Sequence, residues 1–373
     1  MDFNNLKVNI VINGKRLLKK VTLFAGLLTL VIHLDSAYSQ AQFPRRPGGL
    51  NRVPARVRVA SPVGGPERVA EMQRARQILN LFLREGQKQP YVAEQTTRLL
   101  SGMVQESTQL VTHGGLGKER IEFVGPPTMK GEIVLVVGGR VFNYKPGANR
   151  IYEGVASPEV FQERASQFMQ EVKAGRLRIG VRGQENIAGQ VATIVEILGE
   201  NGGKRLWIDD KSGVRLRYEE LNSQGSVVQT SYFNRIDYAT IPEPKDFRPD
   251  SLPNVPHEAA FPKNAPLPSV QAAQSQANFQ LREPTPPVGY RLSGVWVVET
   301  AKGRYVSILR YNDGVRTFAI FQQALPKGSK PTMTSGKMRH NNGVSHWTTS
   351  DSVFTLIGNL RKVAVQDIVN SMK

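Results

Sequence analysis

The chain has 373 residues, of which 40% are hydrophobic, and it contains no cysteine. The lack of cysteine excludes disulfides, cysteine zinc sites, iron–sulfur clusters and an acyl anchor on a modified cysteine. A mean hydropathy of −0.32 excludes a polytopic membrane protein, and the length is enough for two domains. The 49 Lys and Arg against 31 Asp and Glu give a net charge of +18.

Residues 1–41 are expected to be a secretory signal peptide. Four basic residues between positions 15 and 20 precede the apolar run 21–34, and small residues follow at 36–42. Basic, apolar and small-residue regions in this order are typical of an export signal. An uncleaved membrane anchor is the alternative, but the run is shorter than the roughly 18–20 residues that span a bilayer. We therefore expect an exported, periplasmic or extracytoplasmic chain that is soluble after cleavage.

Residues 42–65 predict a basic, flexible tail rich in proline and glycine. Its arginines lie among Pro, Gly and Val without interleaved aromatic residues. Because export removes the chain from most nucleic acid, no nucleic-acid partner is expected. An anionic membrane surface is a candidate partner for the tail, and simple solvation of the tail is the alternative.

Proline marks the main boundary in the rest of the chain. Residues 242–287 contain 11 of the 23 prolines, together with an Ala/Gln/Ser-rich run. Such a composition favours an extended linker over a packed core. We predict one domain at 66–249, a proline-rich linker at 250–286 and a small domain at 287–373.

In chain order, the periodicity predicts helices and strands of a mixed fold. A helix is predicted at 66–84 and a second one from Ser157-Pro158-Glu159 to Gly175, because serine caps a helix and proline suits its first turn. Strands are predicted in the first domain at 89–100, 106–113, 118–124, 132–137, 139–144, 177–182, 189–198, 204–208, 214–221 and 226–233. The turns 209–213 and 222–225 should join the last three strands into an antiparallel meander. The second domain reads as strands at 294–300, 305–311 and 317–323, followed by a helix near 359–372.

Catalytic constellations are largely missing from the sequence. His33 lies in the predicted signal, His257 in the predicted linker, His113 after a strand, and His340 and His346 in a Gly/Asn-rich stretch read as a loop. No pair has the helical spacing that places two imidazoles on one metal, and no Gly-x-Ser-x-Gly motif occurs. Asp209 and Asp210 are best explained as part of a turn before Gly213. We therefore expect no enzyme activity, no metal site and no cofactor, although an active site formed by distant residues stays an alternative.

Several segments together resemble a known family of exported proteins. In the first domain these are Arg205–Asp209, Gly213–Glu219 and Gly225–Val228; in the second they are Pro287–Leu292 and Tyr311–Gly314. They are similar to the periplasmic sigma-E regulatory proteins of the RseB/MucB type, whose first domain is similar to the LolA/LolB lipoprotein carriers. The resemblance covers most of residues 66–373, but it consists of many separate positions and contains no compact motif.

The resemblance implies an α+β fold with a large antiparallel half-barrel sheet wrapped around helices and a smaller α+β C-terminal domain. It also implies that the protein binds the extracytoplasmic part of a membrane-bound anti-sigma factor in an envelope-stress response. A lipid or a lipoprotein acyl chain is the ligand that the carrier-like domain implies. A periplasmic lipid or lipoprotein carrier without a signalling role is the alternative function.

Large apolar side chains on the predicted strands and helices could line an acyl-binding cavity or belong to an ordinary core. The candidates for such a cavity are Phe142, Phe161, Phe168, Trp207, Leu216, Val228 and Phe233.

Overall fold

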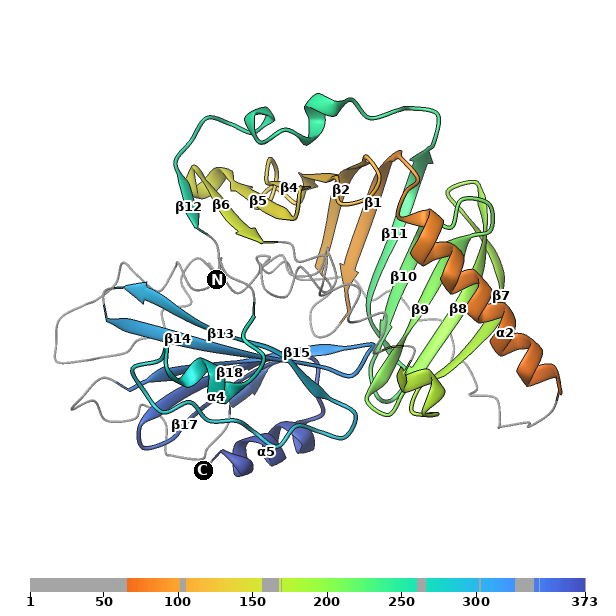
Figure 1. Ribbon diagram of the computed structural model, residues 1–373. Coiled ribbons are helices and arrows are strands. Elements are labelled where there is room, and N and C mark those ends of the chain that lie inside the picture. The colour runs from red at the N-terminus through yellow and green to blue at the C-terminus, as the bar shows by residue number, and fades with distance from the viewer. Residues whose placement is uncertain are drawn as a thin grey trace, which may run out of the picture.

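The computed structural model describes residues 66–100, 105–155, 168, 170–259, 266–301, 303–325, 339–341 and 343–372 (Figure 1). The predicted signal peptide, the predicted basic tail and Phe161 lie outside the described residues. The described chain forms two sheets, a twelve-stranded sheet followed by a six-stranded one.

The first sheet is built mainly from antiparallel neighbours in the chain. Its strands are β1 Tyr91–Leu99, β2 Gln105–His113, β3 Glu119–Gly125, β4 Ile133–Val137, β5 Arg140–Lys145, β6 Arg150–Val155, β7 Arg178–Ile187, β8 Gln190–Gly199, β9 Gly202–Asp209, β10 Arg215–Leu221, β11 Val227–Asp237 and β12 His257–Ala259. Their order across the sheet is β12-β6-β5-β4-β3-β2-β1-β11-β10-β9-β8-β7. The sheet is therefore open, with β12 and β7 at its two ends, and only β12 is parallel to its neighbour.

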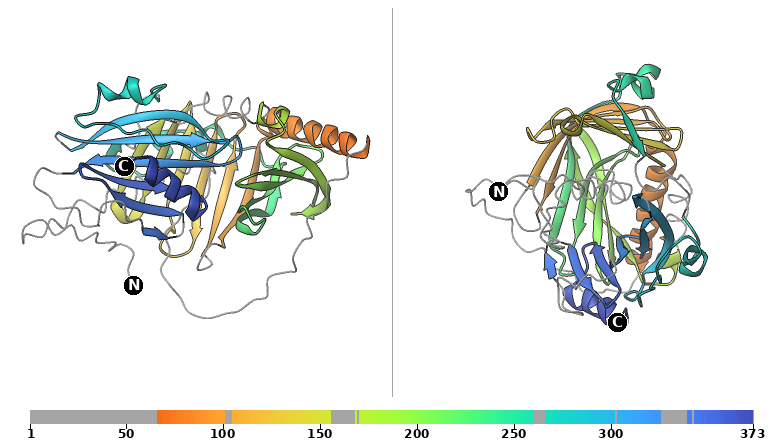
Figure 2. Two further views of the ribbon diagram at one scale, coloured as in Figure 1. Left: turned by 90° about the horizontal axis from the view of Figure 1, so that it is seen from below. Right: turned by 90° about the vertical axis from the view of Figure 1, so that its left-hand side faces the viewer.

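Helix α2, Pro66–Leu81, packs at the β7 end of this sheet, and the π-helical turn η2, Phe82–Gly86, continues it. Ala75 and Leu79 of α2 are buried against Val195 and Ile208 of the sheet. Figure 2 shows the sheet to be strongly curved, with α2 running along one side of it. Of the second predicted helix, residues 168 and 170–173 are helical, and the described residues 174 and 175 form a turn.

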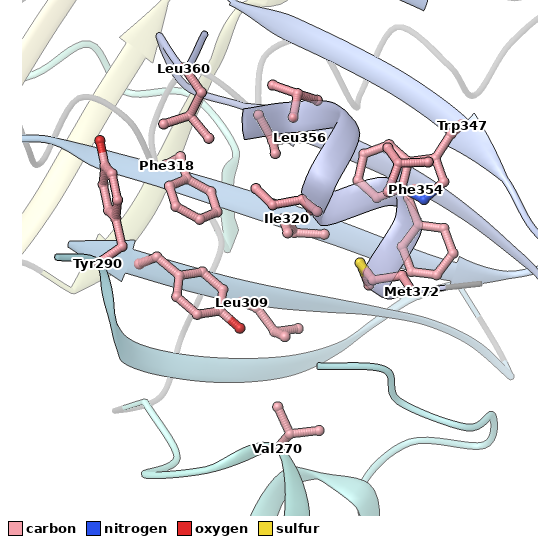
Figure 3. Close-up of a cluster of buried hydrophobic side chains, with 14 of the residues drawn as sticks. Val270, Tyr290, Leu309, Phe318, Ile320, Trp347, Phe354, Leu356, Leu360 and Met372 are labelled. Atoms are coloured by element: carbon pink, nitrogen blue, oxygen red, sulfur yellow. The ribbon is translucent and has the colours of Figure 1, made fainter. Parts of the chain in front are cut away.

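The second sheet contains β13 Arg291–Ala301, β14 Arg304–Asn312, β15 Thr317–Ala324, β16 Arg339–Asn341, β17 Val344–Thr348 and β18 Ser352–Ile357, in the order β13-β14-β15-β18-β17-β16. Helix α5, Lys362–Ser371, covers one face through Val365, Ile368 and Val369. Trp347 and Phe354 stack in this core with ring centroids 5.1 Å apart (Figure 3). The fold is thus α+β, as the sequence predicts.

The proline-rich segment packs against both sheets. Phe247, in the 3₁₀ turn η4 Pro244–Phe247, and Leu252, after the 3₁₀ turn η5 Pro249–Ser251, are buried beside Phe142 in the first sheet. Helix α4, Val270–Gln274, buries Val270 in the core of the second sheet, and Ser269 caps this helix by accepting a hydrogen bond from the Ala272 amide at 3.1 Å. The described parts of 250–286 are therefore well packed, and the domain boundaries themselves stay a prediction.

Two hairpins were not expected from the sequence. Strand β6 follows β5 after the 3₁₀ turn η3, Pro146–Ala148, where Asn149 takes the left-handed conformation with φ 50°. The predicted loop around His340 and His346 is wrong, because these residues lie in β16 and β17, which pair with each other. Short strands with mixed polar residues give little periodic signal, which is why both hairpins escaped prediction.

Candidate functional site

The predicted cavity residues lie in separate, well-packed clusters. Trp207, Leu216 and Phe233 share one buried cluster, whereas Phe142 belongs to a second and Phe168 to a third. Val228 on β11 is partly buried and belongs to none of the hydrophobic clusters of the described residues. The structure thus brings together three of the seven predicted residues, and whether they line a ligand site stays a prediction.

Trp207 is held in place by charged neighbours. The Arg217 guanidinium lies 4.5 Å from the centre of the Trp207 ring, and the indole Nε1 donates to a Glu185 carboxylate oxygen at 2.6 Å. Arg217 also reaches Glu185, at 3.5 Å. These contacts stack the ring and satisfy its N–H, so they fix the orientation of Trp207.

A row of alternating charges crosses the neighbouring strands. Glu196 on β8 accepts from Arg205 on β9 at 2.9 Å, and Arg205 reaches Glu219 on β10 at 3.2 Å. Glu219 also accepts from Arg217, at 2.6 Å. Because each carboxylate faces guanidinium groups in this row, the row ties the strands together and carries no free charge for a ligand.

The centre of the sheet carries buried amide and hydroxyl groups instead of apolar ones. On β1, Gln95 donates to Ser231 of β11 at 2.6 Å, while on β2 Gln109 donates to Ser107 at 2.7 Å. Within the described chain, Gln95 Oε1 and Gln229 Nε2 have no hydrogen-bond partner. Such orphaned groups need water or a ligand to offset their lost hydration. Sequence reasoning missed this group, although polar residues at alternate positions of β1 and β2 were a visible signal.

The turn between β14 and β15 reaches the first sheet. Val315 is buried in the cluster formed by α2 and the β7–β10 end of the first sheet. Gly314, with φ +88°, packs so closely that a Cβ there would lie 3.2 Å from the Phe168 Cα. The turn is pre-shaped by Asp313, whose carboxylate accepts from the Val315 and Arg316 amides at 2.9 and 2.6 Å.

Arg316 makes the main polar contact between the sheets. Its side chain is 4% exposed, and its Nη2 lies 2.9 Å from a Glu220 carboxylate oxygen on β10. Its Nη1 donates to the Asn201 carbonyl, so that one guanidinium joins two segments of the first sheet. Neither contact was found from the sequence, since Arg316 and Glu220 are 96 residues apart.

A second ionic contact lies beside the first. Glu171 is almost fully buried and accepts from Arg176 at 2.9 Å, and Arg291 at the start of β13 reaches the same carboxylate at 3.3 Å. The hydrogen bond from Arg176 is the main reason that the pKa of Glu171 is lowered. The second sheet is thus joined to the first by two buried or partly buried carboxylates.

His113, His346 and Asp209 make contacts that hold neighbouring segments together. His113 stacks on Tyr91 with centroids 5.0 Å apart, and His346 Nδ1 lies 3.0 Å from the Thr355 hydroxyl. Asp209 accepts from Ser212 at 2.6 Å and from Tyr238 at 2.8 Å, which forms the predicted turn. Among the described residues, no group of three or more His, Cys, Asp or Glu side chains could hold a metal ion. The helices in the described part of the chain are all too short or too polar to cross a membrane.

The fold matches that of MucB in solved complexes. "Crystal structure of MucB in complex with MucA(peri)" aligns with 80% of this chain and 98% of its own at 16% identity and a TM-score of 0.57. "The complex structure of Pseudomonas aeruginosa MucA/MucB" aligns with 79% and 97% at 16% identity and a TM-score of 0.59. The alignments extend over both sheets, and the RseB/MucB-type fold expected from the sequence is confirmed.

A LolA superfamily protein, NE2245 from Nitrosomonas europaea, aligns with 48% of this chain and 99% of its own, at 13% identity and a TM-score of 0.25. Models of protein families and curated protein sequences gave no match to this chain.

Proposed function

We propose that this chain is a non-enzymatic extracytoplasmic binding protein that regulates an envelope-stress response by binding the extracytoplasmic part of a membrane-bound anti-sigma factor. The observation that carries the proposal is a fold match that extends over both sheets and covers 98% of MucB in its complex with MucA(peri). A carrier that works through its half-barrel alone needs only the first sheet. The second sheet, with its own core and its ionic contacts to the first, therefore favours the regulatory function.

The charge row on β8–β10 supports binding rather than catalysis. The Glu196 and Glu219 carboxylates of this row are each paired with arginine. A general base or nucleophile instead needs a free lone pair near a substrate position. The proposed compartment rests on the export signal that the sequence predicts.

Sensing of a lipid or lipoprotein is a further part of this proposal, and its support is the sequence resemblance. Phe142 and Trp207 pack in separate clusters, so an acyl chain that used both would have to displace core side chains. Native mass spectrometry of protein purified from its own envelope tests this part. Bound phospholipid or acylated peptide is expected, and a bare protein mass together with no uptake of labelled lipid from vesicles would remove lipid from the proposal.

The partner is tested by a pull-down of the full chain, with a tag after Lys373, from detergent-solubilised envelope. Mass spectrometry should identify a single-span membrane protein with a cytoplasmic sigma-binding domain, enriched over an unrelated exported protein that carries the same tag. Recovery of acylated lipoproteins or phospholipid alone would replace regulation by carriage. Recovery of neither would refute both functions.

A further inference from the structure

The β14–β15 turn presents one apolar and one charged side chain to the first sheet. Val315 is 8% exposed and packs in the same cluster as Leu79 of α2 and Phe168. Arg316 is buried beside it and is paired with Glu220. The turn belongs to the second sheet by connectivity, but its side chains complete the core of the first sheet.

The charges around this turn are poorly hydrated. Burial lowers the pKa of Lys204 on β9 and raises the pKa of Asp313, so both groups lose hydration in their ionised forms. Lys204 makes no ion pair with the described residues, and its ammonium lies 5.5 Å from the centre of the Tyr218 ring. Docking therefore carries a desolvation free energy for these charges, which opposes part of the stabilisation from the Arg316–Glu220 pair.

We propose that the β14–β15 turn is a releasable latch, in which Arg316 bound to Glu220 and to the Asn201 carbonyl holds the second sheet on the first. A buried ion pair contributes little net stability while it is intact, but loss of one partner leaves the other charge uncompensated. Among the described residues, Val315 is the one side chain of the second sheet in the hydrophobic clusters of the first, and relative motion is the default between domains whose interface is not large and hydrophobic. Loss of either partner should therefore favour the undocked arrangement, even though the contact between Arg291 and Glu171 remains.

If the proposed function holds, the latch also affects partner binding. A partner that contacts both sheets meets them in the arrangement that Arg316 sets. Release of the turn would then change the affinity without any change in the residues that touch the partner. The docking itself is a property of the free chain and can be measured without a partner.

Because the chain has no cysteine, two introduced cysteines can carry spin labels at chosen sites. Val191→Cys on β8 and Val363→Cys on α5 replace side chains that are 52% and 72% exposed. Double electron–electron resonance should give one narrow distance distribution in this labelled parent. Arg316→Met and Glu220→Gln should each add longer distances, with at least about a tenfold rise in the undocked population. The undocked population of the double variant should not exceed that of Arg316→Met, because both changes remove the same contact.

Arg248→Met is the matched control, since it also removes one positive charge, but from an exposed pair with Asp250. Far-UV circular dichroism checks that each variant is folded, and if Arg316→Met is unfolded, Glu220→Gln decides alone. Parent-like distances in the folded variants would overturn the latch, as would equal broadening in Arg248→Met. These outcomes are independent of the pull-down, so the latch and the proposed function can fail separately.

Discussion

Replacing Phe142 by alanine tests whether the predicted cavity residues are ordinary core. The ring is 1% exposed and packs against Leu135, Phe247 and Leu252, while the Arg140 guanidinium lies 4.7 Å from its centre. Transfer of such a ring from water is worth about 1.5–3 kcal/mol. The cavity left behind raises the expected loss of unfolding free energy to about 3–5 kcal/mol.

Urea denaturation followed by far-UV circular dichroism and tryptophan fluorescence measures this loss. Phe142→Leu keeps most of the volume and should cost less than about 1.5 kcal/mol. Val191→Ala, at an exposed position, should stay within about 0.5 kcal/mol of the parent. A loss below about 1 kcal/mol for Phe142→Ala would refute tight packing and would show that the ring borders open space, as an acyl-binding site requires.

Three further changes test other parts of the structure. Gly86→Ala should lower the melting temperature strongly, because a Cβ would lie 2.1 Å from the Gly213 carbonyl oxygen. Gly180→Ala should leave the melting temperature nearly unchanged, because no atom lies within 4 Å of the added carbon. The pKa of Glu171 is lowered from its ordinary value of 4.5, so ionised Glu171 stabilises the fold above pH 4.5, and this contribution is lost as the pH falls through the lowered pKa. Glu171→Gln should therefore flatten the acid side of a profile of unfolding free energy against pH. An unchanged acid side would contradict the assignment. Burial lowers the pKa of Lys204, so its positive charge destabilises the fold at neutral pH. Lys204→Met should keep or raise the midpoint of urea denaturation. A clear fall of the midpoint would show that the ammonium has a stabilising partner.

The regular elements of the first sheet were predictable because their signals are local. The meander β9–β10–β11 follows from alternating apolar residues and from turns that contain Gly213 and Gly225, both with positive φ. The hairpin of β5 and β6 lacked such a signal, since Asn149 takes the place that glycine usually holds.

The contacts between the sheets could not be predicted from local patterns. Arg316 follows Asn312-Asp313-Gly314-Val315, which reads as an ordinary exposed turn, and nothing near it in the sequence points to Glu220. The same holds for Gln95 and Ser231, which are paired only because β1 lies beside β11. Side chains that meet through long-range pairing carry no sequence periodicity that links them.

The pairing of β1 with β11 also determines when the first sheet can be completed. Val92 lies opposite Asp237, so the middle of the sheet closes only after almost the whole of its sequence has been made. Until then, β1 and the hairpins that follow it expose an unpaired strand edge, which other chains can join. Long-range closure of this kind is slow, because the entropy of a long loop must be lost before the contact forms. A chaperone that occupies the free edge of β1 during synthesis would therefore protect the chain until β11 has formed.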